Sequence, residues 1–181
     1  MSEKYKAKEL GALYFISVTV VDWVDLLTRS FYKDVIIDSL RYCQQSKGLN
    51  VHAYVIMSNH FHAIVSTESE LLENIMRDLK KFTSKRMIEE MVQTNDGRRE
   101  WMLKQFELAA KRVRKGVNYK VWQDGFHPIH LSSNVMIDQR LDYIHQNPVK
   151  QGYVCEPEHY VYSSAADYVG DKGLLALQMN K

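Results

Sequence analysis

The chain has 181 residues, 45% of them apolar, which suits one domain with a sizeable core. Its longest apolar run, residues 51–57, is far shorter than the roughly 20 residues that cross a bilayer. No apolar stretch of signal-peptide length follows the N-terminus. The two cysteines lack Cys-x-x-Cys spacing. We therefore expect one domain over residues 1–181, cytoplasmic, without a membrane partner, a disulfide framework or a thiolate metal site.

The formal net charge is only +2, but the basic residues are concentrated in one segment. Residues 77–120 hold 13 Lys and Arg against six Asp and Glu, a net charge of +7; 11 basic and 16 acidic residues elsewhere give −5. The segment predicts a basic helical insertion within the domain. Taken alone, such a segment is more often a pair of solvated helices than a nucleic-acid site.

The first half of the chain predicts a strand, a helix, a strand pair and a second helix. Residues 13–20 are rich in β-branched and aromatic side chains, as in a buried strand. Residues 31–47 repeat apolar side chains at helical spacing. Residues 51–57 and 60–65 predict two antiparallel strands around a tight turn. Residues 71–91 then predict a long helix.

The second half begins with a basic helix over residues 100–115. Residues 119–122 and 129–131 predict two short strands that pair with each other, and a helix over 135–147 is expected to stop at Pro148. The tail through residue 168 predicts short helical turns. This order of elements predicts an α+β fold, an antiparallel sheet with helices mainly on one face.

Two histidines lie in alternate positions of a predicted strand. Successive strand side chains alternate between faces, so His60 and His62 project to one side and Phe61 to the other. Two neutral imidazoles on one side can chelate one divalent cation. His-x-His alone is weak, because half-buried structural histidines are common, and the site needs a further ligand and a reactive group.

The helix over 135–147 offers both. Ile137, Leu141 and Ile144 form its apolar stripe, while Tyr143 and Asn147, four residues apart, share another stripe. A phenol and an amide oxygen can thus face one site. An ordinary amphipathic helix would explain the same spacing, and the chain has eleven tyrosines, so a further feature must single one out.

That feature is a resemblance to a known family. His60-Phe61-His62 together with Tyr143-Ile144-His145-Gln146-Asn147-Pro148-Val149-Lys150-Gln151-Gly152 resembles the HUH single-tyrosine transposases, which are insertion-sequence-200-like, and above all the REP-associated tyrosine transposases. The similarity extends to Trp122-Gln123 and to Tyr162-Ser163-Ser164-Ala165. It implies a ferredoxin-like antiparallel sheet.

The resemblance also implies the chemistry. His60 and His62 would bind a divalent metal, Mg or Mn, with Asn147 as third ligand and Gln146 as the alternative. Tyr143 would attack a phosphodiester of single-stranded DNA, at a hairpin-containing, REP-like sequence, and form a 5′-phosphotyrosine that is later rejoined. The protein would act as a monomer or a homodimer.

A strand transferase must grip DNA beyond the phosphate that it cuts, through charge and stacking. The predicted DNA-binding residues are mainly the cations of the basic segment: Arg77, Lys80, Lys81, Lys85, Lys111, Arg112, Arg114 and the aromatic Trp122.

Three other functions stay open at this point. The first is a metal-dependent phosphodiesterase that uses activated water, although the His60 motif lacks the acidic residue of two-metal hydrolase sites. The second is a host-retained hairpin-binding protein without strand transfer, and the third is an RNA-binding module that stacks bases on its sheet.

Overall fold

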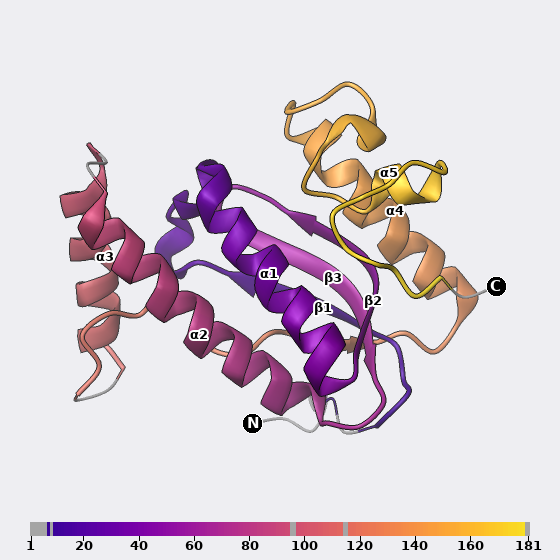
Figure 1. Cartoon of the computed structure of the whole chain (residues 1–181), viewed down its shortest axis with the longest axis horizontal. Helices are drawn as coiled ribbons and strands as arrows, with labels where there is room; N and C mark the ends of the chain where they lie inside the picture. Colours follow the sequence, from indigo (N-terminus) through magenta and orange to yellow (C-terminus); the bar gives the residue numbers. More distant parts are fainter. Residues whose placement is uncertain (1–6, 8, 95–96, 114–115, 180–181) are drawn as a thin grey trace.

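The protein folds around a four-stranded antiparallel sheet. The computed structural model describes residues 7, 9–94, 97–113 and 116–179. The strand order is β2-β3-β1-β4, formed by β1 (Tyr14–Thr19), β2 (Leu49–Ile56), β3 (His60–Thr67) and β4 (Ile129–His130). With α1 (Ser30–Lys47) between β1 and β2, and α2 (Leu72–Gln93) after β3, this is the ferredoxin-like arrangement (Figure 1), which confirms the predicted α+β class.

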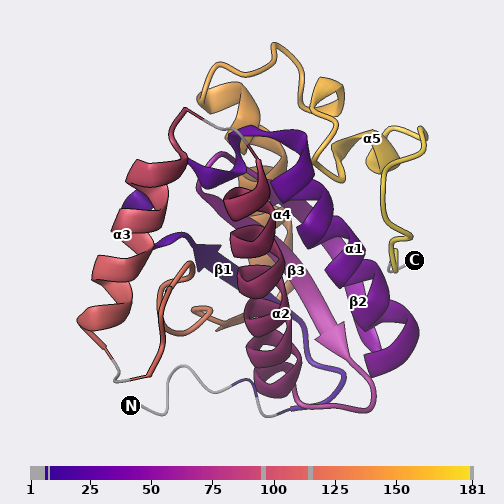
Figure 2. The ribbon, with the colours of Figure 1, turned by 60° about the vertical axis from the view of Figure 1, so that its left-hand side comes forward.

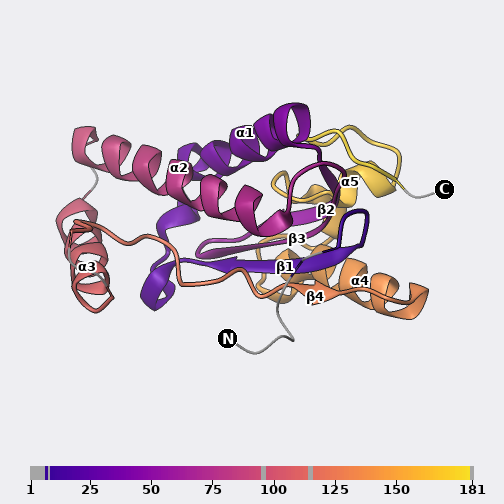
Figure 3. The same ribbon diagram turned by 90° about the horizontal axis from the view of Figure 1, so that it is seen from below.

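The two long helices α1 and α2 cover one face of the sheet (Figure 3). The main core lies between them and the sheet, where Ile16, Ile36 and Phe61 are fully buried. Gly48 ends α1 as expected: it adopts a left-handed φ of 65°, and its N–H donates to the Cys43 carbonyl. None of the helices in the described ranges is long and apolar enough to cross a bilayer.

A third long helix, α4 (Asn134–Lys150), lies on the opposite face of the sheet (Figure 3). A smaller core joins it to the strands, with Phe15, Val55 and Ile64 from the sheet and Ile144 from the helix. The alternation of side chains along the strands makes this possible, because residues of β1, β2 and β3 that point away from the main core include apolar ones as well. The sheet is therefore packed on both faces.

The basic segment forms α2 from Arg77 onward and the helix α3 (Arg99–Lys111), which stands to the left of α2 in Figure 2. Met102 and Phe106 of α3 are fully buried in the main core, so the charged residues are left on the outer side of the helix. The predicted helix over 100–115 is confirmed through residue 111, and residues 114–115 lie outside the described part.

The two short strands predicted at 119–122 and 129–131 do not pair with each other, and that prediction was wrong. Both pair with β1 and its extension: Trp122 bridges Val20, and Ile129 pairs with Phe15. Between them the Ser17 N–H donates to the Phe126 carbonyl. The open edge of β1 accepts both segments antiparallel, because β3 occupies its other edge.

Pro148 does not stop α4 either, since the helix continues to Lys150. Proline removes one backbone donor, the N–H that would reach the Ile144 carbonyl. Only two helical residues follow it, and the Asn147 carbonyl still accepts from the Gln151 N–H. The helix therefore ends within one turn after Pro148 and not at Pro148 itself.

The tail after α4 covers the outer edge of β2. It contains η4 (Pro157–His159) and the short helix α5 (Ala165–Tyr168), which confirms the predicted helical turns. The Ile56 N–H donates to the Tyr162 carbonyl, and the Ser164 N–H donates to the Tyr54 carbonyl. An edge strand with unpaired backbone groups invites association with other chains, and the tail occupies those groups of β2.

Candidate active site

The strand β3 carries the histidine pair on the face that α4 covers. His60 and His62 point to this face, while Phe61 between them is fully buried in the main core on the other. The two imidazole ring centroids lie 4.7 Å apart. The predicted projection of both rings to one side of the strand is what the structure shows.

The helix α4 presents Tyr143 and Asn147 to the histidines. The rings of Tyr143 and His62 lie 5.2 Å apart between centroids, and Phe15 packs against both. A cavity of about 400 Å³ joins these groups. Its lining residues come from the sheet, from the turn after β1 and from α4 with the residue that follows it: Ser17, Thr19, Trp23, His60, His62, Tyr143, Asn147, Lys150 and Gln151.

Both imidazoles are neutral at physiological pH. Burial lowers the pKa of His60, and burial together with the nearby His60 and Arg140 lowers the pKa of His62 to about 3. The backbone of Ile16 acts weakly in the opposite direction on the His62 pKa. A neutral imidazole keeps a ring lone pair for a metal, so the environment suits ligation.

The hydrogen bonds of the two rings differ. His60 Nδ1 lies 2.8 Å from the Asn59 Oδ1, which fixes the orientation of its ring. His62 Nδ1 is buried and has no hydrogen-bond partner of normal geometry among the described residues, even though the Ile16 backbone lies close by. A buried ring nitrogen without a partner is costly, and a bound cation would satisfy it.

The donor set fits a divalent metal only if an amide joins the histidines. The described residues hold no group of three or more His, Cys, Asp and Glu around a common point. Asn147 is buried and lines the cavity, whereas Gln146 lines a separate cavity beside His145. Asn147, and not Gln146, therefore shares a cavity with the two imidazoles.

A side-chain clasp between α4 and the tail holds the tyrosine helix against the sheet. His145 Nε2 lies 2.9 Å from the Ser164 Oγ, and the Tyr54 N–H donates to the same oxygen at 2.9 Å. The Tyr168 ring packs edge-on against His145 at 4.9 Å between centroids. These contacts bring the segments around residues 145 and 164, which are distant in the sequence, side by side.

The sequence did not predict several residues of the cavity. Ser17 and Thr19 could have been found, because they lie opposite His62 and His60 in the pairing of β1 with β3. Lys150, seven residues after Tyr143, falls on the same helical face, two turns on. Trp23 follows β1 in the single turn η2 (Val21–Trp23) and has no periodic signal.

The predicted DNA-binding residues fall into four groups. Lys81 and Lys85 are exposed on α2, beside a groove of about 570 Å³ that runs to residues 117–124. Arg77, Lys111 and Arg112 are also exposed, each beside an acidic side chain. Arg114 lies outside the described residues. The structure does not bring these cations into the histidine cavity.

Lys80 and Trp122 are engaged inside the protein, which argues against both predictions. The Lys80 ammonium donates to the carbonyls of Gln123 and Gly125 at 2.6 Å each, and burial lowers its pKa to about 8. Trp122 is buried and donates from Nε1 to the Thr83 hydroxyl. The Trp122 side chain is buried, and the Lys80 ammonium is already engaged by two carbonyls.

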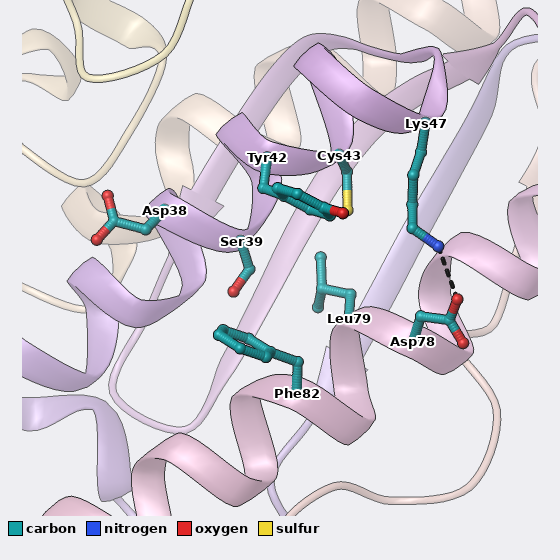
Figure 4. Close-up of a pocket in the computed structure, with 8 residues that line it drawn as sticks. All are labelled: Asp38, Ser39, Tyr42, Cys43, Lys47, Asp78, Leu79 and Phe82. Carbon is teal, nitrogen blue, oxygen red and sulfur yellow. Dashed lines mark hydrogen bonds and ion pairs between the residues drawn. The ribbon is translucent and has the colours of Figure 1, made fainter.

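A second cavity, of about 510 Å³, lies between α1 and α2 on the opposite side of the sheet from α4 (Figure 4). Tyr42 and Phe82 flank it, and a Lys47–Asp78 ion pair lies at one end. Burial raises the pKa of the Cys43 thiol in its wall to about 11, so this cavity lacks an activated nucleophile. The reactive groups gather at the histidines.

Comparisons with known proteins agree with this geometry. The family model described as IS200-like transposase matches residues 23–104, which include both histidines and end before α4. A solved REP-associated tyrosine transposase bound to a REP hairpin is similar with a TM-score of 0.67 and 19% identity, over 100% of this chain and 94% of that one. A putative transposase from Deinococcus radiodurans R1 is more distant, with a TM-score of 0.44 and 17% identity over 75% and 91% of the two chains. No curated protein sequence matches the chain.

The histidine pair on a ferredoxin-like sheet, faced by one tyrosine, is the arrangement that the sequence resemblance to single-tyrosine transposases implies. Residues 23–104 match the IS200-like transposase family, and the whole chain has the fold of the REP-associated tyrosine transposase, which confirms the resemblance noted in the sequence. The family match ends before Tyr143, so the role of that residue rests on its motif and its position.

The clasp predicts a specific dependence of stability on pH. Burial lowers the pKa of His145 to about 4, so below the ordinary value of about 6.5 the unfolded chain binds a proton that the folded chain refuses. The free energy of unfolding should fall as the pH drops from about 6.5 to about 4. His145→Gln keeps a hydrogen-bonding side chain beside Ser164 but cannot titrate, so denaturant melts of this variant should show a shallower fall. An unchanged pH dependence would contradict the prediction.

Proposed function

We propose that the protein cleaves and rejoins single-stranded DNA through a covalent 5′-phosphotyrosine on Tyr143. The observation that carries this proposal is the arrangement of four groups in one cavity: two neutral imidazoles from β3, with a phenol and an amide from α4.

Each step of the proposed reaction exchanges one P–O bond for another. The Tyr143 oxygen attacks the phosphorus and the bond to the 3′ oxygen breaks, so a 3′-hydroxyl leaves and the phosphate stays on the tyrosine. Tyr143 is 38% exposed, so its phenol proton can pass to solvent, and the leaving oxygen can take one up. A 3′-hydroxyl of another strand reverses the step and joins the strands without ATP.

The residues around Tyr143 position the phosphate. His60, His62 and Asn147 would hold a divalent metal, Mg or Mn, which when bound supplies a Lewis acid for the non-bridging phosphate oxygens. Lys150 lines the same cavity and brings a positive charge to the phosphate. Phe15 packs against both His62 and Tyr143 and sets the spacing between the ligand and the nucleophile.

The DNA is proposed to carry a hairpin. The REP-associated tyrosine transposase whose fold this chain shares was solved with a REP hairpin. The exposed cations on α2 and α3 form a surface for such a duplex, because exposed ion pairs are worth only about 0–1 kcal/mol and phosphates can replace the acidic partners. The proposed DNA-binding surface consists of Lys81, Lys85, Lys111 and Arg112.

Hydrolysis by activated water is less well supported than attack by the tyrosine. The described residues that line the cavity include no carboxylate, so none of them is an Asp or Glu placed to take a proton from water. A protein that only binds a hairpin would have no use for a phenol placed beside a neutral histidine pair. A covalent adduct distinguishes strand transfer from the other two functions, and cleavage without an adduct distinguishes hydrolysis from binding alone.

The nucleophile is tested by Tyr143→Phe. Labelled single-stranded oligonucleotides with a hairpin are incubated with the protein and separated on a denaturing gel. The wild-type protein should give a covalent adduct and Tyr143→Phe none, because only the hydroxyl is removed and the exposed ring keeps its contacts. Tyr153→Phe, also on an exposed ring after α4, is the matched control and should keep the adduct. Adduct on the Tyr143→Phe protein would reassign the nucleophile.

The metal is tested by titration as well as by activity. His60→Ala and His62→Ala should each abolish binding of Mn²⁺, measured by calorimetry, and should abolish cleavage. Asn147→Ala should weaken both less, because a single amide oxygen is a poorer anchor than imidazole. Mg²⁺ and Mn²⁺ should both restore activity after chelation. Cleavage that persists in excess EDTA would remove the metal from the mechanism.

The basic surface is tested by the salt dependence of binding. Each lost phosphate contact should reduce the slope of log K against log salt by about 0.7 to 0.9, so Lys81→Ala with Lys85→Ala should flatten the slope by about 1.4 to 1.8 if both touch phosphates. Lys111→Ala with Arg112→Ala tests α3 in the same way. Metal binding should not change in either variant. Unchanged slopes in both would leave these residues as a solvated surface.

A further inference from the structure

Trp23 is exposed at the mouth of the histidine cavity, although nothing in the chemistry above uses it. Its side chain is 60% exposed, while Val21 and Val24 on either side are buried. The indole lines the cavity and meets the His60 ring edge-on, with 6.0 Å between ring centroids. A large apolar side chain in water, next to a buried polar site, indicates a ligand surface.

The backbone around Trp23 is fixed in a conformation that bulky residues avoid. Asp22 and Trp23 have φ angles of 51° and 55°, in the left-handed region. Two hydrogen bonds hold this conformation: the Trp23 N–H donates to the Val20 carbonyl, and the Asn59 amide donates to the Trp23 carbonyl. Such backbones persist where the surroundings enforce them, and they cluster at functional sites.

Asn59 connects the indole to the metal ligand. Its Nδ2 donates to the Trp23 carbonyl at 3.3 Å, and its Oδ1 lies 2.8 Å from the His60 Nδ1. One side chain therefore sets the position of the Trp23 backbone relative to a histidine that faces the scissile phosphate. A flat surface held at a fixed place beside that phosphate can define which nucleotide enters the cavity.

We propose that Trp23 is a stacking platform for one unpaired base next to the scissile phosphate. The inference rests on the proposed function, because the partner is the single-stranded DNA that Tyr143 cleaves. Aromatic side chains bind single strands by stacking on bases, and every base has a π-face, so the platform selects an unpaired nucleotide more than a particular base. A base held in a duplex cannot stack on it, which directs cleavage to the single-stranded flank of a hairpin.

The experiment pairs a change in the protein with a change in the DNA. An adduct-forming oligonucleotide is first selected from a pool with a fixed hairpin and random flanks. Binding is then measured with Tyr143→Phe protein, which cannot cleave, on DNA carrying one abasic position at each nucleotide of the flank in turn. Trp23→Ala and Trp23→Phe are added to this background, and Trp101→Ala is the matched control, because Trp101 is a similarly exposed tryptophan on α3.

Loss of one stack should weaken binding by about 5- to 100-fold. Trp23→Ala should show this loss on intact DNA, while Trp23→Phe keeps most of the affinity and Trp101→Ala keeps all the sensitivity to abasic sites. At one flank position the abasic DNA should bind equally to the protein that retains Trp23 and to the Trp23→Ala variant, because the stack is lost in either case. The abasic series on the protein that retains Trp23 does not depend on the folding of any Trp23 variant.

The outcomes separate this inference from the function on which it rests. If the wild-type protein forms the adduct but no abasic position removes the difference between Trp23 and Trp23→Ala, the stacking platform is wrong and strand transfer stands. If Trp23→Ala and Trp101→Ala weaken binding equally, the effect is general and the inference also fails. If no oligonucleotide forms an adduct, the proposed function fails and the platform fails with it.

Discussion

The site depends on β3 being a strand that is packed on both faces. Alternation sends Phe61 into the core under α1 and α2 and leaves His60 and His62 together on the other face. A shift of one residue in its pairing with β1 would bury the histidines in the apolar core and expose the phenylalanine. Because Ile64 and Phe15 are also buried on the histidine face, the second core under α4 fixes the same register. The chemistry and the packing therefore require one and the same alignment of strands.

The helix α4, on the histidine face of the sheet, must hold Tyr143 beside the histidines. Its own apolar side, at Ile144, gives only a small core, and the tail adds the polar clasp of His145 with Ser164. Since Ser164 also binds the backbone of Tyr54, the clasp ties α4 to the edge strand β2. The helix is thus attached to the sheet by apolar contacts at its centre and hydrogen bonds at its side, and the tyrosine remains exposed between them.

Sequence periodicity predicted what depends on local pattern: the two long helices, the histidine hairpin and the shared stripe of Tyr143 and Asn147. It failed where a partner distant in the sequence decides the outcome. Trp122 pairs with Val20 instead of with its neighbours because β1 has an open edge, and Lys80 is buried because loop carbonyls surround its ammonium. Composition cannot distinguish such a lysine from an exposed one on the same helix. Trp23 gave no signal because a single irregular turn has no period.

The residues that surround the cavity form two sets: side chains that their neighbours hold in place, and side chains that are exposed to solvent. The proposed ligands are oriented by their neighbours: His62 is buried and stacks on Phe15, and the half-buried His60 is held by Asn59. The two groups proposed to contact DNA, Tyr143 and Trp23, are exposed but anchored through their backbones, one on a helix and the other in a strained turn. A single-stranded substrate brings little structure of its own, so the order needed for an in-line attack must come from the protein. The strained turn beside β3 fits the same proposed requirement, because a flexible loop could not keep an exposed ring at a fixed distance from the phosphate that Tyr143 is proposed to attack.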